Sequence, residues 1–152
     1  MIIKAEIQDQ ELLTTIALQS KAYWGYSEEQ IEKWREDLTV KPKMFEEWRI
    51  YKYLINDTIG GFYILNRTNL KTSILEFLFV VPNFINQGIG SKLLEHVKAY
   101  CKKEFCTVLN VLADPNAESF YLKHGFRVIN KQESSIKGRF LPEMELLFPE
   151  NM

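Results

Sequence analysis

The sequence predicts an α/β domain with a mixed sheet, and three observations support that fold class. Apolar residues alternate with polar ones in several short segments, as in β-strands, and recur at helical spacing in others. In chain order these segments read β-α-α-β-β-β-α-β-α-β-β, so hairpins dominate the first half and helices separate later strands. No linker rich in Pro, Gly or Ser divides the chain, so residues 1–152 are expected to form a single domain.

The composition is typical of a soluble globular protein, with 46% hydrophobic and 26% charged residues. Lys and Arg number 19 and Asp and Glu 20, which gives a net charge of −1. A chain so close to neutral has no overall field for a polyanion, which argues against nucleic acid as a partner.

Two features indicate a cytoplasmic location. Two cysteines, Cys101 and Cys106, fit a reducing compartment better than a secreted scaffold. The first residues show no signal peptide, and the longest apolar run, Phe77–Val81, is too short to span a bilayer. We therefore expect no membrane association.

The first third of the chain is predicted to hold one strand and two helices. Residues 1–7 form the expected strand, because apolar and charged side chains alternate along it. Asp9 is placed to cap a helix over residues 10–24. Ser27 opens a second helix with the Ser-x-x-Gln spacing of a capping box.

A hairpin is predicted next, from residues 48–55 and 58–65. Asn56-Asp57 is a plausible two-residue turn between these strands, and Gly60-Gly61 is expected to mark a bulge.

The second half alternates strands with helices. Residues 73–81 are almost continuously apolar at their end, which predicts a central strand buried on both faces. A helix over 88–103 and a short buried strand over 108–112 follow.

The last helix and two closing strands complete the predicted elements. Asp114 followed by Pro115 predicts an N-cap with proline at the first helical position, and this helix ends at Gly125. Residues 126–131 and 143–148 are the closing strands.

The most informative stretch joins the strongest predicted strand to the following helix. It reads V-V-P-N-F-I-N-Q-G-I-G-S from Val80 to Ser91. Free N–H groups and the helix dipole favour an anion at such a helix start, and glycine lets an oxygen-rich group approach the backbone. The Lys of a Walker loop is absent, and Leu93 stands where a dinucleotide fingerprint needs Gly or Ala. An alternative role of Gly88 and Gly90 is close packing of the helix on the strand.

A second segment, Asp114 to Phe126, combines a capped helix, an inner tyrosine and a Gly-Phe exit. Together the two segments resemble the GNAT superfamily of acetyl-CoA-dependent N-acetyltransferases. In that family a V-x-P-x-x-x-x-x-G-x-G segment binds the CoA pyrophosphate, as Val80 to Gly90 would here. A later A-x-x-[LF]-Y-x-x-x-G-F segment matches Ala117 to Phe126. The resemblance implies a GNAT-like mixed, mostly antiparallel sheet of six to seven strands with helices on both faces.

The resemblance also implies which residues bind acetyl-CoA. By position they are Leu78, Phe79 and Val80 along the pantetheine arm, Asn86, Gln87, Gly88, Ile89, Gly90 and Ser91 around the pyrophosphate, and Asn116 and Tyr121 on the later segment. The sequence departs from the family pattern at Ile85, where Arg or Gln is usual, and at Asp114, where Asn is usual. We favour Asn116 over Asp114 as the CoA contact, because an amide is the better partner for pantetheine or phosphate.

The implied reaction is direct transfer of an acetyl group to a primary amine of a small molecule or protein, in a ternary complex and without a metal. Tyr121 matches the family's general acid, and a phenol with a pKa near 10 suits a departing thiolate. Glu76, on the strand expected to be central, is the candidate base, directly or through water. The alternatives are a core aromatic for Tyr121 and a solvated strand-end side chain for Glu76.

Acceptor binding is expected from the connection between the first two helices, where Tyr23, Trp24 and Tyr26 surround a glycine. Arg139, in a polar loop before the last strand, could pair with an acceptor carboxylate. A bare domain of this length leaves no room for a separate acceptor domain, so loops or a second copy in a homodimer would complete the cleft. The alternative function is a CoA- or acyl-CoA-binding sensor without transfer activity.

Overall fold

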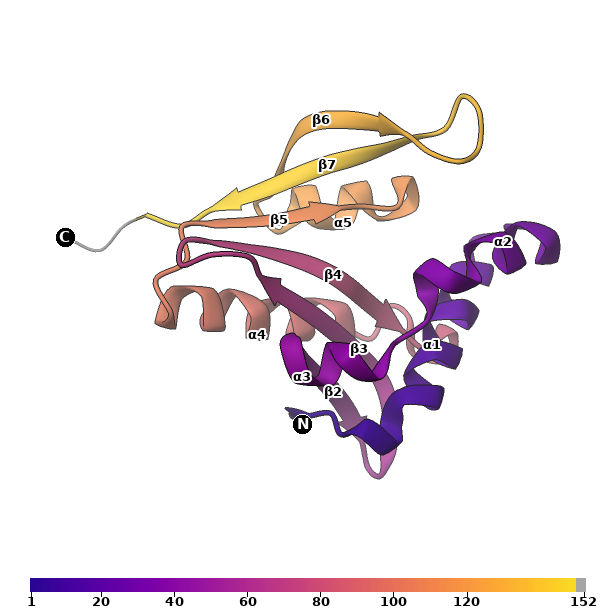
Figure 1. The fold of residues 1–152 in the computed structure, drawn as a ribbon, viewed down its shortest axis with the longest axis horizontal. Helices are drawn as coiled ribbons and strands as arrows, with labels where there is room; N and C mark the ends of the chain where they lie inside the picture. The colour runs from indigo at the N-terminus through magenta and orange to yellow at the C-terminus, as the bar shows by residue number, and fades with distance from the viewer. Residues whose placement is uncertain (150–152) are drawn as a thin grey trace. The chain divides into compact units, whose positions relative to one another are not determined.

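The structure is a computed structural model that describes residues 1–149. Its seven strands are β1 (Ile2–Lys4), β2 (Arg49–Ile55), β3 (Thr58–Arg67), β4 (Thr72–Val80), β5 (Val108–Leu112), β6 (Arg127–Glu133) and β7 (Phe140–Leu147) (Figure 1). They form one sheet in the order β1-β2-β3-β4-β5-β7-β6. The pairs β1–β2, β2–β3, β5–β7 and β6–β7 are antiparallel, and β4–β5 is parallel. The predicted mixed, mostly antiparallel sheet is therefore confirmed.

Helices flank this sheet. They are α1 (Gln10–Ala22), α2 (Glu28–Leu38), α3 (Pro42–Glu47), α4 (Ile89–Lys103) and α5 (Glu118–Lys123), with three 3-10 turns, η1 (Ile7–Asp9), η2 (Pro82–Phe84) and η3 (Pro115–Ala117). The described residues divide into two compact units. The first unit is Met1–Leu65 with Phe77–His96, and the second is Asn66–Glu76 with the described residues from Val97 on.

In the first unit, β3 carries a different helix on each face. Phe62 and Ile64 belong to a core that includes Leu13 and Ile16 of α1, and all four are fully or almost fully buried. The opposite face meets α4 at Gly61, where an added Cβ would lie 2.8 Å from a backbone oxygen of β4 and 3.2 Å from two α4 side chains. Glycine is therefore required for this close approach of strand and helix.

The β2–β3 hairpin forms as the sequence predicts. Ile55 pairs with Thr58 across a two-residue turn, in which Asn56 has a φ of 56°. The pairing then shifts by one residue, so Gly60 is the extra residue of a bulge.

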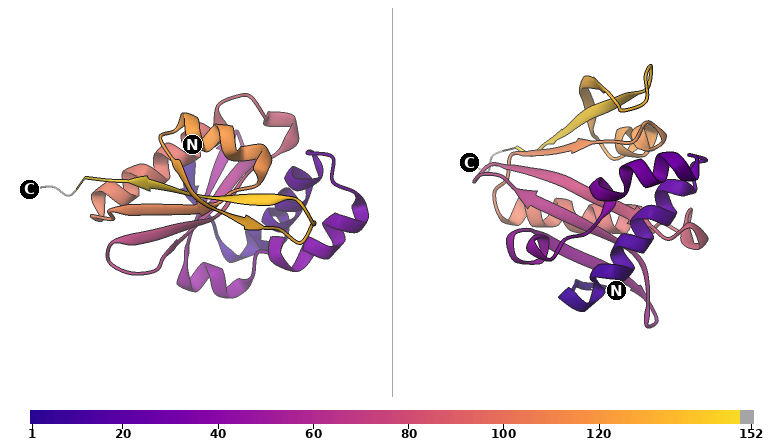
Figure 2. Two further views of the ribbon diagram at one scale, coloured as in Figure 1. Left: turned by 90° about the horizontal axis from the view of Figure 1, so that it is seen from above. Right: turned by 45° about the vertical axis from the view of Figure 1, so that its right-hand side comes forward.

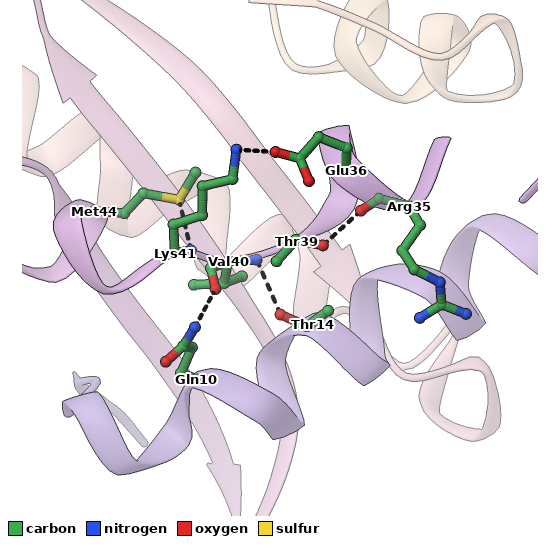
Figure 3. A network of polar contacts seen from close by, with 8 residues as sticks. All are labelled: Gln10, Thr14, Arg35, Glu36, Thr39, Val40, Lys41 and Met44. Carbon is green, nitrogen blue, oxygen red and sulfur yellow. Dashed lines mark hydrogen bonds and ion pairs between the residues drawn. The ribbon is translucent and has the colours of Figure 1, made fainter. Parts of the chain in front are cut away.

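The segment between α2 and α3 is fastened to α1 by side chains (Figure 3). Val40 is fully buried. Its N–H donates to Thr14 Oγ1 at 2.9 Å, and its carbonyl oxygen accepts from Gln10 Nε2 at 2.9 Å. The short helix α3 that follows was not predicted, because it has only six residues and no apolar period to reveal it.

In the second unit, β5, β7 and β6 are paired in that order, and Figure 2 shows β6 and β7 running side by side into one hairpin loop. Asp114 caps η3 by accepting the N–H of Asn116 at 2.8 Å, and α5 follows. The N-cap prediction is therefore confirmed, although the capped turn is 3-10. Gly125, with a φ of 96°, ends this helical segment.

Two local predictions are wrong. Asp9 does not cap α1; its carboxylate instead pairs with Lys52 Nζ at 2.7 Å and accepts the N–H of Glu6. The strand β4 is not buried on both faces: Ser73, Leu75 and Phe77 are buried, whereas the residues between and after them are partly or fully exposed. When the exposed face of a strand also carries apolar residues, its sequence looks the same as that of a strand buried on both faces.

Candidate functional site

The turn between β4 and α4 presents backbone groups at a helix start. Asn86 and Gly88 both have left-handed φ values, 70° and 81°, and the helix begins at Ile89. The N–H of Lys92 donates to the Gly88 carbonyl at 3.0 Å. The N–H groups of Ile89 and Gly90 therefore precede the first bond of the helical ladder, where the dipole favours an anion.

The side chains in this turn have separate roles. Ile89 is 3% exposed and packs beside Gly60 and Gly61, so only its backbone is available to a ligand. Gly88 is exposed, and nothing lies within 4 Å of a Cβ built on it. Asn86 and Gln87 are exposed, and Ser91 is half-buried. The six predicted pyrophosphate residues thus lie in this turn and at the start of α4.

The predicted pantetheine residues Leu78, Phe79 and Val80 form the end of β4, and all three are half-buried. The ring of Phe79 packs on Phe62 and Phe77, with centroids 6.1 and 5.9 Å apart. The parallel pairing of β4 with β5 ends at Leu75, before these three residues. Their backbone groups therefore lie beyond that ladder.

The predicted acceptor aromatics of the first unit form two pairs at the α1–α2 connection. Tyr23 and Trp24 are 51% and 45% exposed, and their rings meet edge to face at 5.2 Å. Tyr26 packs on Trp34 at 4.8 Å, and Lys21 Nζ lies 5.4 Å from the Trp34 ring. Large aromatic side chains are thus exposed here and oriented by their neighbours.

In the second unit the structure brings Asp114, Asn116 and Arg139 together. Asp114 Oδ1 accepts from the backbone N–H and from Nδ2 of Asn116, at 2.8 and 2.9 Å. Asp114 Oδ2 accepts from Arg139 Nη2 at 3.0 Å, and the two side chains are only 11% and 15% exposed. Arg139 is therefore mostly buried and paired within the chain, with Asp114 as its partner.

Tyr121 is buried at 5% exposure, with its ring 5.2 Å from those of Phe120 and Phe126. Burial raises the pKa of Tyr121 above its ordinary value near 10. This environment thus moves the pKa of the phenol further from that of a thiol. The hydroxyl stays protonated at neutral pH and is available as a hydrogen-bond donor.

Glu76 is exposed, and its Oε2 accepts from Asn66 Nδ2 at 3.0 Å. The expectation of a costly carboxylate on a doubly buried strand is therefore wrong. The side chain lies on the more exposed face of β4, the face it shares with Ile74 and Leu78.

One polar cluster in the first unit was missed by sequence reasoning. Tyr63 is fully buried, and its hydroxyl lies 2.7 Å from Nδ1 of His96. Tyr51 stacks on Tyr63 at 5.7 Å, and the guanidinium of Arg49 lies 4.2 Å from the Tyr51 ring centre. Burial and the charge of Arg49 lower the pKa of His96. A lone histidine at helical spacing gave no signal of these partners, which are far away in sequence.

Cys101 and Cys106 are both buried free thiols. Burial and the neighbouring Cys106 raise the pKa of Cys101 to about 12, so this thiol is a poor nucleophile. Within residues 1–149, no group of three or more His, Cys, Asp or Glu side chains is arranged to hold a metal ion. Across the same described range, no helix combines the length and apolar character needed to cross a membrane.

Comparisons with known proteins identify the family and the fold of this chain. The family described as acetyltransferase (GNAT) domain matches residues 5–148. The PaiA N-acetyltransferase from Thermoplasma acidophilum, solved in complex with coenzyme A, has 25% sequence identity and a TM-score of 0.80, over 97% of this chain and 98% of that chain.

Two further solved structures share the fold. The ribosomal-protein-S18-alanine N-acetyltransferase from Escherichia coli has 20% identity and a TM-score of 0.73, over 97% of this chain and 92% of its own. A GNAT family acetyltransferase from Elizabethkingia anophelis with acetyl-CoA bound has 20% identity and a TM-score of 0.68, over 97% of both chains. The family match over residues 5–148 and the shared fold show that this chain belongs to the GNAT acetyltransferase family.

Proposed function

We propose that the protein transfers an acetyl group from acetyl-CoA to a primary amine, directly and in a ternary complex. The observation that carries this proposal is the glycine turn before α4, where exposed backbone meets a helix start. The protein's membership of the GNAT acetyltransferase family supports the same function. The neighbour from Thermoplasma acidophilum was solved with coenzyme A, which supports acetyl-CoA as the ligand of this turn.

The residues present fit a pyrophosphate. Gly88 leaves open the space that a Cβ would enter, and its φ of 81° is one that other residues adopt only with strain. The exposed amides of Asn86 and Gln87 add side-chain donors beside the N–H groups of Ile89 and Gly90. No side chain of this turn is negatively charged, so the turn itself does not repel a phosphate.

Bound acetyl-CoA would supply the activated acetyl thioester. The chain's own part is to hold the two reactants and to provide donors where charge develops. We propose that backbone groups of Leu78, Phe79 and Val80 orient the pantetheine arm. Asn116 remains our choice over Asp114 for a CoA contact, because an amide can donate to an oxygen of CoA, whereas the carboxylate of Asp114 only accepts and is paired with Arg139.

We propose Tyr121 as the donor to the departing thiolate. Its raised pKa keeps the hydroxyl protonated, so it acts by donating a hydrogen bond and giving up its proton only as the sulfur gains charge. We propose Glu76 as the group that accepts the amine's proton through water, since it is an exposed carboxylate held by Asn66.

On the acceptor side we propose Tyr23, Trp24 and Tyr26 as contacts, because two of them are exposed aromatics. We propose that Arg139 binds an acceptor carboxylate while it remains paired with Asp114. A second copy of the chain could complete the acceptor cleft, and sedimentation of the purified protein tests this. The two free thiols support our proposal of a cytoplasmic location.

Two measurements test the proposed function. Calorimetry with acetyl-CoA should show saturable binding, and release of CoA thiol should increase when members of a panel of primary amines are added. A Glu76→Gln variant should bind acetyl-CoA normally but transfer more slowly, with its loss greatest at low pH, where more of the amine is protonated. Binding without amine-stimulated thiol release would reject the enzyme and favour a CoA-binding sensor.

A further inference from the structure

The strand β6 forms one edge of the sheet, and within residues 1–149 its strand partner is β7 alone (Figure 1). The other edge strand, β1, has three residues, whereas β6 has seven. A short edge strand is one way in which proteins prevent pairing with another chain, and β6 lacks this protection. All of its residues except Val128 are exposed. The β6 edge is therefore long and open enough to pair with a further strand.

The backbone groups of two β6 residues are directed away from β7. The carbonyl oxygen of Pro142, in β7, accepts the N–H of Ala113, which follows β5, at 2.9 Å. Pro142 therefore faces β5, so its β6 partner Lys131 directs its own N–H and carbonyl to the open edge. Because this direction alternates along a strand, the N–H and carbonyl of Glu133 are directed outward as well.

The alternation holds as far as the end of β6. The N–H of Ser134 donates to the carbonyl oxygen of Arg139, just before β7, at 2.8 Å, so Ser134 faces β7 as the alternation requires. The register shift of β6 against β7 lies between Val128 and Asn130, before this part of the strand. This part of the open edge is therefore regular.

The charges on this edge are complementary to those of a second copy of the chain. Lys131 and Glu133 are exposed, and within residues 1–149 neither side chain forms an ion pair or a hydrogen bond. If two identical strands pair antiparallel about Gln132, Lys131 of each copy lies opposite Glu133 of the other. These two residues would also exchange backbone hydrogen bonds, because their N–H and carbonyl groups point outward. A centre on Lys131 would instead place two like charges opposite each other, which is unfavourable.

We propose that two copies of the chain pair through their β6 edges, antiparallel and centred on Gln132, with Lys131 of each copy opposite Glu133 of the other. The occupant of the edge is a second copy, because the same two residues supply both halves of the charge match. The dimer should be weak and reversible, since a strand edge alone buries less than about 1,200 Å². The pairing does not depend on the proposed transfer reaction and is measured without acetyl-CoA or an amine.

Sedimentation velocity of the full chain at increasing concentration tests the pairing. The unmodified protein should show a reversible equilibrium between monomer and dimer. Lys131→Glu should raise the dissociation constant of the dimer by about tenfold or more, because two ion pairs become two pairs of like charge. Glu133→Lys should have the same effect for the same reason. An equimolar mixture of the two variants should dimerise to within about threefold of the unmodified protein, since every opposed pair then carries opposite charges.

The matched control is Lys4→Glu, which makes the same charge change at an exposed lysine of β1, the other edge strand. It should leave the dissociation constant of the dimer unchanged. The melting temperatures of Lys131→Glu, Glu133→Lys and Lys4→Glu should all stay close to that of the unmodified protein, because each variant changes an exposed side chain.

A cysteine at the centre of the pairing tests its register. Gln132→Cys would bring two thiols together across the two-fold axis, with Cα atoms about 4.5 Å apart, within the range of about 4.4–6.8 Å that a disulfide spans. Oxidation with diamide should therefore give a covalent dimer. Asn130→Cys is the control and should give far less, because its two copies would lie about 13 Å apart along the strands. The native Cys101 and Cys106 are buried and should not cross-link.

Four results would overturn the proposal. The first is a monomer at every concentration. The second is an equal loss of dimer in Lys131→Glu and Lys4→Glu. The third is a mixture of Lys131→Glu and Glu133→Lys that dimerises no better than either variant alone. The fourth is a disulfide in Asn130→Cys but not in Gln132→Cys, which would reject the centre on Gln132.

Discussion

The glycine turn before α4 and the segment from Asp114 to Gly125 offer different chemical groups. At the turn, Gly88 has no side chain and the side chain of Ile89 is buried in the core, so backbone N–H groups are what the turn presents. In the later segment the side chains dominate: Asp114 is bonded to Asn116 and Arg139, and Tyr121 is enclosed by aromatic rings. Backbone donors tolerate changes of neighbouring side chains, whereas a buried hydroxyl or ion pair depends on single atoms.

This difference predicts how each region responds to substitution. On the proposed function, changes at the turn should act on ligand affinity, because its backbone N–H groups would hold the ligand without taking part in the reaction. Changes in the later segment should act on the rate of transfer or on folding. Variants of Tyr121, Arg139 and Gly88 can break that division or sharpen it, and a fourth variant, at His96, addresses stability alone.

The largest effect is expected for Tyr121→Phe. Loss of the donated hydrogen bond and proton should lower the maximal rate of acetyl transfer by about 100-fold, the lower end of general acid catalysis. The dissociation constant of acetyl-CoA, measured by calorimetry, should change little. An unchanged rate would show that Tyr121 is only a core aromatic residue. The segment from Asp114 to Gly125 would then have no known part in the reaction.

Arg139→Gln should lower the free energy of unfolding by about 2 kcal/mol, because it leaves the mostly buried Asp114 carboxylate without its charged partner. Urea denaturation measures this loss. The matched control is Arg127→Gln, which breaks a more exposed pair with Glu145 and should cost less than about 1 kcal/mol. If Arg139→Gln instead raises the KM for the amine at unchanged stability, Arg139 serves the acceptor.

Gly88→Ala should raise the dissociation constant of acetyl-CoA by about tenfold, the equivalent of about 1.4 kcal/mol. A Cβ would enter the open space through which we propose that the phosphate oxygens approach, and the φ of 81° would be strained. Gly138→Ala is the control, because Gly138 has the same φ and similarly open surroundings. Equal losses of acetyl-CoA affinity in both variants would show that backbone strain, and not a lost contact at the glycine turn, weakens binding.

The smallest effect concerns pH and a side chain of the first unit. Because burial lowers the pKa of His96, the unfolded chain binds a proton there more readily than the folded one. This contribution to stability is complete above the usual histidine pKa, about 6.5, and is lost as the pH falls through the window between that value and the lower folded pKa. His96→Gln should flatten this part of the stability profile, whereas His124→Gln should retain it. A retained slope in His96→Gln would assign the pH dependence to other groups.

Local signals predicted most of the fold, including the turn that precedes α4. The Asn56 turn, the Gly60 bulge, the Asp114 cap and the glycine turn each follow from conformations that few residue types adopt. These features depend on neighbours within a few residues, so the sequence alone carries them.

Contacts between distant segments could not be predicted in the same way. Asp9 was expected to cap a helix, but a lysine 43 residues away takes its carboxylate. Tyr63 and His96, 33 residues apart, meet only because β3 and α4 pack together. Phe105 has no sequence signal at all, since its left-handed conformation runs against the preference of its residue type.

The hydrogen bonds between Val40 and α1 have a consequence for hydrogen exchange. Val40 lies between two helices, outside any regular element, yet its N–H is bonded to Thr14 and its side chain is fully buried. An amide so placed should exchange with solvent mainly when its contact with α1 opens. Its protection should therefore approach that of amides in the α1 core, so Val40 opens with the helix to which it is bonded and not as part of an independent loop.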